Sequence, residues 1–359
     1  MNTNTLTLSL LLSSSLVAGC GGATGSTGFD DYADSEQIVS DFSEIVVIPG
    51  YELLATRLAE FAVAVEALSA DPTPANLTAA KEAWVSSRVP WEQSEGFLFG
   101  PVDSGGYDPA LDSWPVNRTD LDAVLSSDDA ITQAFVANLD DTLKGFHTAE
   151  YLLFGEENTK VVSDFSARDL EYTAAVAAEM ATISEALYQD WVSGDQPYGD
   201  LLSTAGQDGN TVYTSRGSAA EEIVRGMIGI LDEVSNGKIA DPYVEQDQSL
   251  VESQFSFNSL SDFADNIRSV QNLYTGDNPE AGTSGLGIST YVASIDSELD
   301  ARITAEIADS ISAIEAIEGP FRDAILDSGS AAAIDNAQEI IWVTMESVEG
   351  DLLPLFTDY

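Results

Sequence analysis

An all-α protein, organised as two four-helix-type bundles in tandem, is predicted by three features of the sequence. Apolar residues recur at intervals of three and four over most of the chain, which is the spacing of one face of a helix. No run of alternating β-branched residues indicates a strand. A stretch rich in Gly, Asp and Pro, residues 194–210, separates two helical parts of similar length. We therefore expect one bundle over residues 36–196 and a second over residues 211–359.

The first 19 residues are predicted to be a lipoprotein signal peptide. Residues 6–17 are apolar and rich in hydroxyl side chains, and residues 16–20 read Leu-Val-Ala-Gly-Cys, the pattern of small residues before a cysteine that is typical of a bacterial lipoprotein cleavage site. Cys20 would then carry the lipid and anchor an exported protein in the cell envelope, facing the periplasm or the cell surface. The segment departs from the usual pattern because it contains no Lys or Arg. Residues 20–35, rich in Gly, Ser and Thr, are expected to form a flexible tether.

The charge balance excludes nucleic acid as a partner. The chain has 61 acidic and 13 basic residues and a formal charge of −48, whereas phosphate binding requires a basic surface. The acidic residues are spread along the chain, which fits a surface adapted to salty water and also a field that concentrates cations. Cys20 is the only cysteine, so the chain can form neither an intrachain disulfide nor a cysteine-based metal site.

Helical periodicity and turn residues place the individual elements. Pro49-Gly50 is expected to break or kink the first helix, and Pro90 is expected to bend the second. A loop over residues 97–118, rich in Gly, Pro and Asp, contains Asp103, Asp108 and Asp112, which lack the EF-hand spacing and are interpreted as solvated. The predicted helices cover residues 34–69, 76–95, 120–125, 129–154 and 164–192, and then 218–235, 260–274, 288–317 and 331–348.

The first candidate for chemistry is His147, the only histidine in the chain. Glu150 follows three positions later, and a helix brings such positions onto one face. The pair lies on or beside the apolar stripe of its predicted helix, where an unpaired carboxylate would cost several kcal/mol. Two interpretations stay open: a metal site, or a satisfied interior hydrogen bond between the two side chains.

The helix predicted over residues 76–95 carries a second pair of charges on its core face. Arg88 and Glu95 share that face with Trp84 and Trp91. Carboxylates and imidazoles on facing helices form the metal sites of helical bundles, so Glu95 could complete a set with the pair on the later helix. Arg88 would orient a carboxylate or bind an anionic ligand. A plain buried salt bridge is the alternative.

Several segments resemble the imelysin family. Residues 145–155, Gly-Phe-His-Thr-Ala-Glu-Tyr-Leu-Leu-Phe-Gly, are similar to its GxHxxE signature, and residues 87–100 are similar to its other N-terminal motif, with Trp114-Pro115 as a frequent companion. Residues 252–259 with Asp262-Phe263 resemble its motif in the second half. The resemblance implies two helical bundles with a site near their interface, in bacterial envelope proteins grouped with iron-regulated and iron-uptake components and also classed among metallopeptidases. The site residues that it implies are His147, Glu150, Arg88, Glu95 and Ser256.

The residue types favour metal binding over peptide hydrolysis. Zinc peptidases of the inverted type need a second histidine at position 151, where this chain has Tyr, and the chain has no other histidine. A ligand set of His147, Glu150 and Glu95 is oxygen-rich and suits iron, with zinc or calcium as alternatives. The predicted function is binding of a metal ion or a metal-containing ligand in iron uptake, with iron-transport components of the envelope as partners. A metal-dependent peptidase and a ligand-binding or structural module without metal remain the alternatives.

A histidine ligand must be neutral, which gives the metal hypothesis a pH dependence. From the ordinary pKa of an imidazole, near 6.5, we expect metal affinity to fall below about pH 6.

Overall fold

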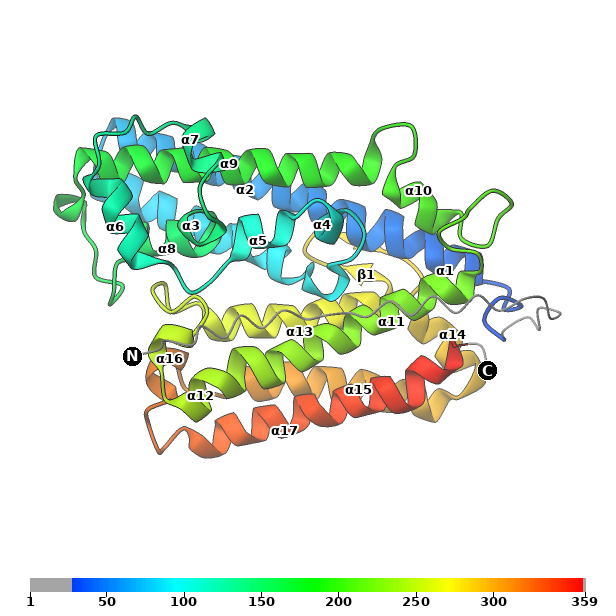
Figure 1. The fold of residues 1–359 in the computed structure, drawn as a ribbon. Helices are drawn as coiled ribbons and strands as arrows, with labels where there is room; N and C mark the ends of the chain where they lie inside the picture. Colours follow the sequence, from blue (N-terminus) through cyan, green and yellow to red (C-terminus); the bar gives the residue numbers. More distant parts are fainter. Residues whose placement is uncertain (1–27, 358–359) are drawn as a thin grey trace, which may run out of the picture.

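The predicted all-α class is confirmed by the computed structural model, which describes residues 28–357. Within that range the regular secondary structure is helical apart from one short antiparallel hairpin, β1 (Asp277–Asn278) and β2 (Thr283–Ser284). The arrangement as two four-helix-type bundles in tandem stays a prediction. Figure 1 shows the helices in two layers, one from each part of the chain.

The first layer is centred on three long helices, α2 (Ile48–Ala70), α3 (Pro74–Glu92) and α9 (Ala167–Val192). Helix α2 packs against both of the others. Thr73 caps α3 by accepting a hydrogen bond from the backbone N–H of Asn76, and Pro74 occupies the first turn, where its missing N–H is not needed. The shorter elements of this layer are α1 (Ser35–Asp41), η1 (Phe42–Val47), η2 (Glu95–Phe97), α4 (Pro101–Ser104), α5 (Tyr107–Asp112), α6 (Arg118–Ser126), α7 (Gln133–Ala137), η3 (Asp141–Leu143), α8 (Gly145–Phe154), η4 (Val162–Asp164) and α10 (Tyr198–Ser203).

The second layer is built from four long helices that run side by side in Figure 1, α11 (Arg216–Asp232), α13 (Ser259–Thr275), α15 (Ser297–Glu315) and α17 (Ala331–Ser347). Helix α15 packs against both α13 and α17. A π-helical segment, η5 (Glu233–Ala240), continues α11 toward the site described below. The remaining elements are α12 (Asp241–Glu245), η6 (Gln248–Leu250), α14 (Ile288–Ile295), α16 (Phe321–Ala324), η7 (Val348–Leu352) and η8 (Leu353–Leu355).

The two layers meet along α3 and η2 on one side and α11 and α13 on the other. Two glycines allow this close approach. A Cβ on Gly226 would lie 2.1 Å from the carbonyl oxygen of Gly96, and one on Gly96 would lie 2.7 Å from Ser269 Oγ. The buried apolar side chains of both layers form one hydrophobic core. The division into separate domains at residues 197–210 stays a prediction.

The predicted first helix is one continuous helical stretch, from α1 through η1 into α2, with Pro49 in the first turn of α2. A proline cannot donate to the carbonyl one turn earlier, so a neighbouring group must do so. Thr283 Oγ1, from β2, donates to the carbonyl oxygen of Ile45 at 2.6 Å, and Asn278 Nδ2, from β1, donates to that of Val46 at 3.0 Å. The hairpin therefore satisfies the carbonyls that the π-helical segment and the proline leave free.

Part of the predicted tether is wrong. The signal peptide and Cys20 lie outside the described residues, but Phe29 is fully buried between Tyr291 and Phe356, and α1 begins at Ser35. Residues 28–35 are thus packed against the second layer. Among residues 28–357, no helix is long and apolar enough to cross a membrane.

The helix predicted over residues 129–154 is also wrong, because it is divided into α7, η3 and α8. Asp140 caps η3 through its side chain, and Lys144 then takes an extended conformation. Gly145 has a φ of +77°, outside the helical region, so α8 starts in a new direction. The apolar spacing of three and four continues through these breaks, so it does not indicate where the helix is interrupted.

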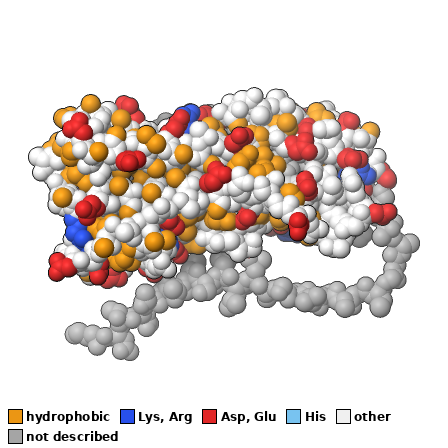
Figure 2. Space-filling model, turned by 90° about the horizontal axis from the view of Figure 1, so that it is seen from above, with side chains coloured by type: hydrophobic (Ala, Val, Ile, Leu, Met, Phe, Trp, Pro, Cys, Tyr) orange, Lys and Arg blue, Asp and Glu red, His pale blue; other side chains and the backbone are white. Residues whose placement is uncertain are grey.

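The surface agrees with the composition. Figure 2 shows acidic side chains scattered over the face viewed from above, with few Lys or Arg between hydrophobic ones. No single acidic tail or block accounts for the charge, which is −48 over the whole chain.

Candidate metal centre

His147 is positioned by the close packing of α8 against α5. A Cβ on Gly145 would lie 2.3 Å from the carbonyl oxygen of Leu111, so no other residue fits where these two elements meet. His147 is in the first turn of α8, and Asp112 is the last residue of α5. Gly145, the glycine of the GxHxxE signature, therefore has two roles. It adopts the positive φ at the start of α8, and it lets α8 approach α5 closely enough to bring the imidazole of His147 to the carboxylate of Asp112.

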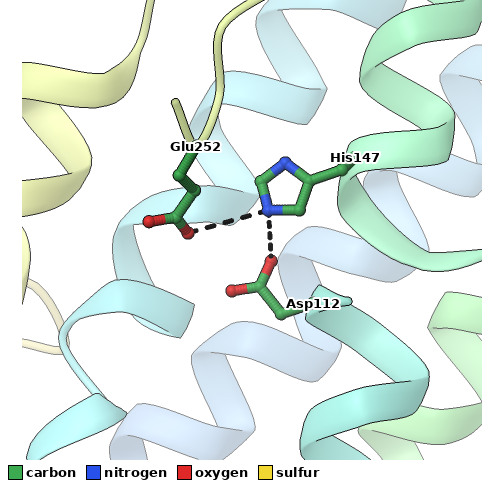
Figure 3. A group of neighbouring side chains, drawn as sticks. All are labelled: Asp112, His147 and Glu252. Atoms are coloured by element: carbon green, nitrogen blue, oxygen red, sulfur yellow. Dashed lines mark ion pairs between the residues drawn. The ribbon is translucent and has the colours of Figure 1, made fainter. Parts of the chain in front are cut away.

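Two carboxylates converge on one nitrogen of His147, as Figure 3 shows. The Nε2 atom lies 3.1 Å from Asp112 Oδ1 and 3.6 Å from Glu252 Oε1. Glu252 belongs to the turn that precedes α13, so the second layer supplies this oxygen. One ligand atom from each of the three side chains lies within 4.8 Å of the others, a spacing that a metal ion can bridge.

The Nε2 atom makes no hydrogen bond within the described part of the chain, although His147 is only 2% exposed. Its two carboxylate neighbours are close, but their positions do not meet hydrogen-bond geometry. The nitrogen is compensated by ion-pair contacts alone, and a buried polar atom without a well-formed hydrogen bond calls for an explanation. A metal ion held between the nitrogen and the two oxygens would supply one.

Glu150 holds the opposite side of the ring. Its Oε2 atom lies 3.3 Å from His147 Nδ1, and its Oε1 atom accepts hydrogen bonds from the backbone N–H groups of Phe255 and Ser256 and from Ser256 Oγ, at 2.9, 2.7 and 2.7 Å. A carboxylate on the second nitrogen of a metal-binding histidine fixes its tautomer and orientation. Glu150 therefore positions the imidazole and ties it to the turn that carries Glu252.

Arg88 is the organising cation of the cluster. It is fully buried on α3 and pairs with Glu92, Asp112, Glu252 and Asp262. Its Nη2 donates to Glu252 Oε1 at 2.8 Å, and its Nε donates to Asp262 Oδ2 at 3.3 Å. One guanidinium thus links α3 and α5 of the first layer to the turn and helix of the second. Arg88 lies at ion-pair distance from four carboxylates, and its role in orienting one of them for a ligand stays a prediction.

A second buried cation, Lys238 of η5, faces the other side of Glu252. Its Nζ lies 2.7 Å from Glu95 Oε2, 3.0 Å from Glu252 Oε2 and 3.6 Å from Glu92 Oε2. We call Asp112, His147 and Glu252 the histidine half of the cluster, and Glu92, Glu95 and Glu252 around Lys238 the lysine half. Both halves are buried, and they share one carboxylate.

The two halves differ in the protonation that their surroundings favour. Burial opposes the charges of Asp112 and Glu252, but nearby cations outweigh it: Arg88 and His147 lower the pKa of Asp112, and Lys238 lowers that of Glu252 to about 2. Burial dominates for Glu92 and Glu95 and raises both pKa values well above the ordinary range. The carboxylates that face His147 are therefore ionised and suited to bind a cation.

The pKa of His147 itself is raised. Burial disfavours the imidazolium, but Asp112 outweighs this effect, with Glu150 and Glu252 adding to it, and the pKa lies well above the ordinary value. A metal ion must displace this proton. The pH below which affinity falls is consequently higher than the value near 6 expected from an unperturbed imidazole.

A cavity of about 230 Å³ leads to the cluster from the surface. Its wall includes Asp112 and Glu95, one residue from each half, together with Asp108, Glu233 and Trp114. An acidic, narrow approach of this kind concentrates cations in front of a site.

The structure rearranges the predicted ligand set. His147, Glu150, Arg88 and Glu95 lie in one buried cluster with Ser256 at its half-buried edge, but Glu150 contacts the other nitrogen of the ring and Glu95 contacts Lys238. Asp112, interpreted from the sequence as part of a solvated loop, is 5% exposed and faces the histidine. Glu252, Asp262 and Glu92 lay inside the quoted motifs, and that position was the available signal. Lys238 had no such signal.

The fold and the motifs agree with comparisons to known proteins. The imelysin family model matches residues 47–341. This chain belongs to the imelysin family. It is 31% identical over 326 residues to the iron-regulated protein A of Synechococcus elongatus, covering 89% of this chain and 86% of that one.

Two crystal structures of other proteins share the imelysin fold seen here. A protein assigned as an iron-regulated protein A precursor from Parabacteroides distasonis superimposes with a TM-score of 0.80 at 29% identity, over 93% of this chain and 97% of the other. An imelysin-like protein from Psychrobacter arcticum gives a TM-score of 0.72 at 12% identity, over 90% and 96% of the two chains. At that lower identity the likeness concerns the fold alone.

The donor set of this imelysin fits a metal ion but not a two-histidine zinc site. One imidazole with carboxylates is the kind of donor set found in the di-iron sites of helical bundles, and it suits other ions that accept oxygen ligands. The chain has no second histidine for the zinc site of a peptidase.

Proposed function

We propose that this protein binds a metal ion, with iron as the first candidate, between Asp112, His147 and Glu252. The observation that carries the proposal is the buried Nε2 atom of His147, which lacks a well-formed hydrogen bond and faces two carboxylates whose pKa values are lowered by nearby cations. The ligands would be Nε2 and one oxygen from each carboxylate. The ion would supply positive charge that the cluster lacks.

Charge in the cluster supports a cation. Six carboxylates lie within it, from Glu92, Glu95, Asp112, Glu150, Glu252 and Asp262, against the permanent cations Arg88 and Lys238. Buried charge is stable only when it is neutralised. In the metal-free protein, protons on the imidazole and on some carboxylates neutralise the excess negative charge. A metal ion would replace those protons.

The proposed role is iron uptake at the cell envelope. Two relatives carry the name iron-regulated protein A, and residues 16–20 have the pattern of a lipoprotein cleavage site. The lipid on Cys20 would hold the protein to a membrane, where iron-transport components would be its partners. Mass spectrometry of the N-terminus of protein from membranes tests the anchor: a lipidated Cys20 supports it, and an unmodified residue contradicts it.

Equilibrium titration with Fe(II), without oxygen, tests the metal site. The wild type is expected to bind iron above the background of a variant in which the histidine half is disabled, His147→Ala with Asp112→Asn. A peptide-hydrolysis assay on the same samples tests the peptidase alternative, which requires turnover that chelation removes. Equal iron uptake by the wild type and the variant would contradict the proposed site.

A further inference from the structure

The lysine half is arranged like a cation site that already contains a cation. Its carboxylates Glu92, Glu95 and Glu252, together with Asp112 of the histidine half, each offer one oxygen, and these atoms lie within 4.8 Å of one another. Four buried carboxylates from α3, η2, α5 and the turn before α13 could hold a divalent ion such as manganese or iron, which accept oxygen ligands. In the structure, the Nζ atom of Lys238 is what faces three of them.

We propose that Lys238 is a built-in cation that fills the lysine half and limits the protein to one metal ion. The inference rests on the proposed function, because it assigns the remaining, histidine half to that single ion. Lys238 is 1% exposed and enters from η5, a π-helical segment, so its ammonium group reaches the carboxylates from the second layer. Its hydrogen bond to Glu95 Oε2 is 2.7 Å long.

Glu252 shows how the division works. Its Oε1 atom faces His147 and Arg88, whereas its Oε2 atom is buried, makes no hydrogen bond within residues 28–357 and faces Lys238 at 3.0 Å. An oxygen left with only a cation nearby is available to a metal ion once that cation is removed. Glu252 would then bridge two ions, as shared carboxylates do in two-metal sites, where the ions are about 3.5–4 Å apart.

The ammonium also explains how the cluster excludes a second ion without a protein wall between the halves. Two divalent cations and Lys238 would bring like charges together at contact distance in a region of low dielectric, where repulsion is strong. The chain thus sets the number of ions by electrostatic exclusion. Trp114 lies beside both halves, with its ring 5.8 Å from Lys238 Nζ and 6.0 Å from the His147 ring.

The test is the number of Mn(II) ions bound per chain, measured at pH 8 by equilibrium dialysis and by electron paramagnetic resonance. The wild type is expected to bind one ion and Lys238→Met two, with a spin-coupled signal because the ions share Glu252. Lys81→Met removes the same charge at a site where the ammonium donates to the carbonyl of Lys160 and lies over the Phe154 ring, so it measures uptake by the acidic surface. Lys238→Gln, which keeps a donor group, serves if Lys238→Met fails to fold.

The outcomes separate this inference from the proposed function. No ion in the wild type and one in Lys238→Met would support the built-in cation and contradict the proposed site in the histidine half. The same number of ions in the wild type and in Lys238→Met, whether none, one or two, would overturn the inference. Uptake by Lys81→Met equal to that by Lys238→Met would overturn it as well.

Discussion

The histidine half and the lysine half share Glu252 and are equally buried, but the chain completes them with different cations. The imidazole of His147 can lose its proton and then presents a lone pair to Asp112 and Glu252. The ammonium of Lys238 offers no lone pair while it is charged, and although burial opposes that charge, Glu252 and Glu95 raise its pKa well above the ordinary value. One carboxylate-rich interior therefore contains one position that can exchange a proton for a metal ion and one that is closed.

The largest expected effect is the loss of stability on removing Arg88, whose guanidinium pairs with carboxylates of both halves. Arg88→Met should lower the free energy of unfolding by about 3–5 kcal/mol, because removing one partner of a buried ion-pair network leaves its carboxylates uncompensated. Urea unfolding of the metal-free protein measures the change. Arg302→Met is the control: Arg302 pairs with Glu306 and Asp351, but its side chain is 43% exposed, and loss of an exposed pair costs about 1 kcal/mol or less. Equal losses in the two variants would contradict a central role for Arg88.

His147→Ala is expected to have the largest effect on metal binding, because it disables the histidine half and leaves the lysine half intact. Loss of the only nitrogen ligand should weaken Fe(II) binding by more than about 100-fold, beyond the 10–100-fold effect usual for groups that merely support a ligand. Isothermal titration calorimetry measures the affinity. A variant that binds iron like the wild type and differs only in melting temperature would favour the structural interpretation of the His–Glu pair.

Glu150→Gln tests the support of the imidazole. The amide cannot accept from three donors and the ring as the carboxylate does, so metal affinity should fall about 10–100-fold. Ser256→Ala removes one of those donors and should weaken binding by less than about tenfold, from a hydrogen bond worth about 1 kcal/mol. The same titration serves for both. A larger loss in Ser256→Ala than in Glu150→Gln would contradict the proposed order of support.

The smallest expected effect concerns Asp108, in the cavity that leads to the cluster. Burial, with the charges of Asp112 and Glu233, raises its pKa to about 7. The folded protein then keeps a proton that the unfolded chain loses near pH 4, so stability falls as pH rises from about 4 to about 7. Asp108→Asn removes this contribution. Its stability relative to the wild type should increase by about 1–3 kcal/mol between pH 4.5 and pH 8, measured by urea unfolding, because solvent in the cavity screens part of the full linkage value of about 3 kcal/mol. Parallel pH curves would show that Asp108 has an ordinary pKa.

The helical fold and part of the site could be predicted from the sequence because they depend on local patterns. The apolar periodicity predicted the long helices, and a charge on an apolar face marked His147, Glu150, Arg88 and Glu95. Apolar periodicity carries no information on the direction of the backbone, so it could not predict the change of direction at Gly145.

The metal-facing oxygens could not be predicted for a different reason. Asp112 comes from a Gly- and Pro-rich segment in which a buried and a solvated aspartate have the same local sequence, and its burial depends on the contact between Gly145 and Leu111. Lys238 reaches the cluster from the other layer, 143 residues away from Glu95 along the chain. The positions of Asp112 and Lys238 therefore depend on packing between distant parts of the chain, which the local sequence does not encode.

The most direct test of the account is the position of iron in a crystal of the wild-type protein soaked in Fe(II) without oxygen. Anomalous scattering at the iron edge is expected to show one peak in the cluster, within about 2.0–2.3 Å of His147 Nε2, a typical metal–nitrogen distance, and in contact with Asp112 and Glu252. Lys238 should remain against Glu95. A peak among Glu92, Glu95 and Glu252 with Lys238 displaced, or a cluster without a peak, would contradict it.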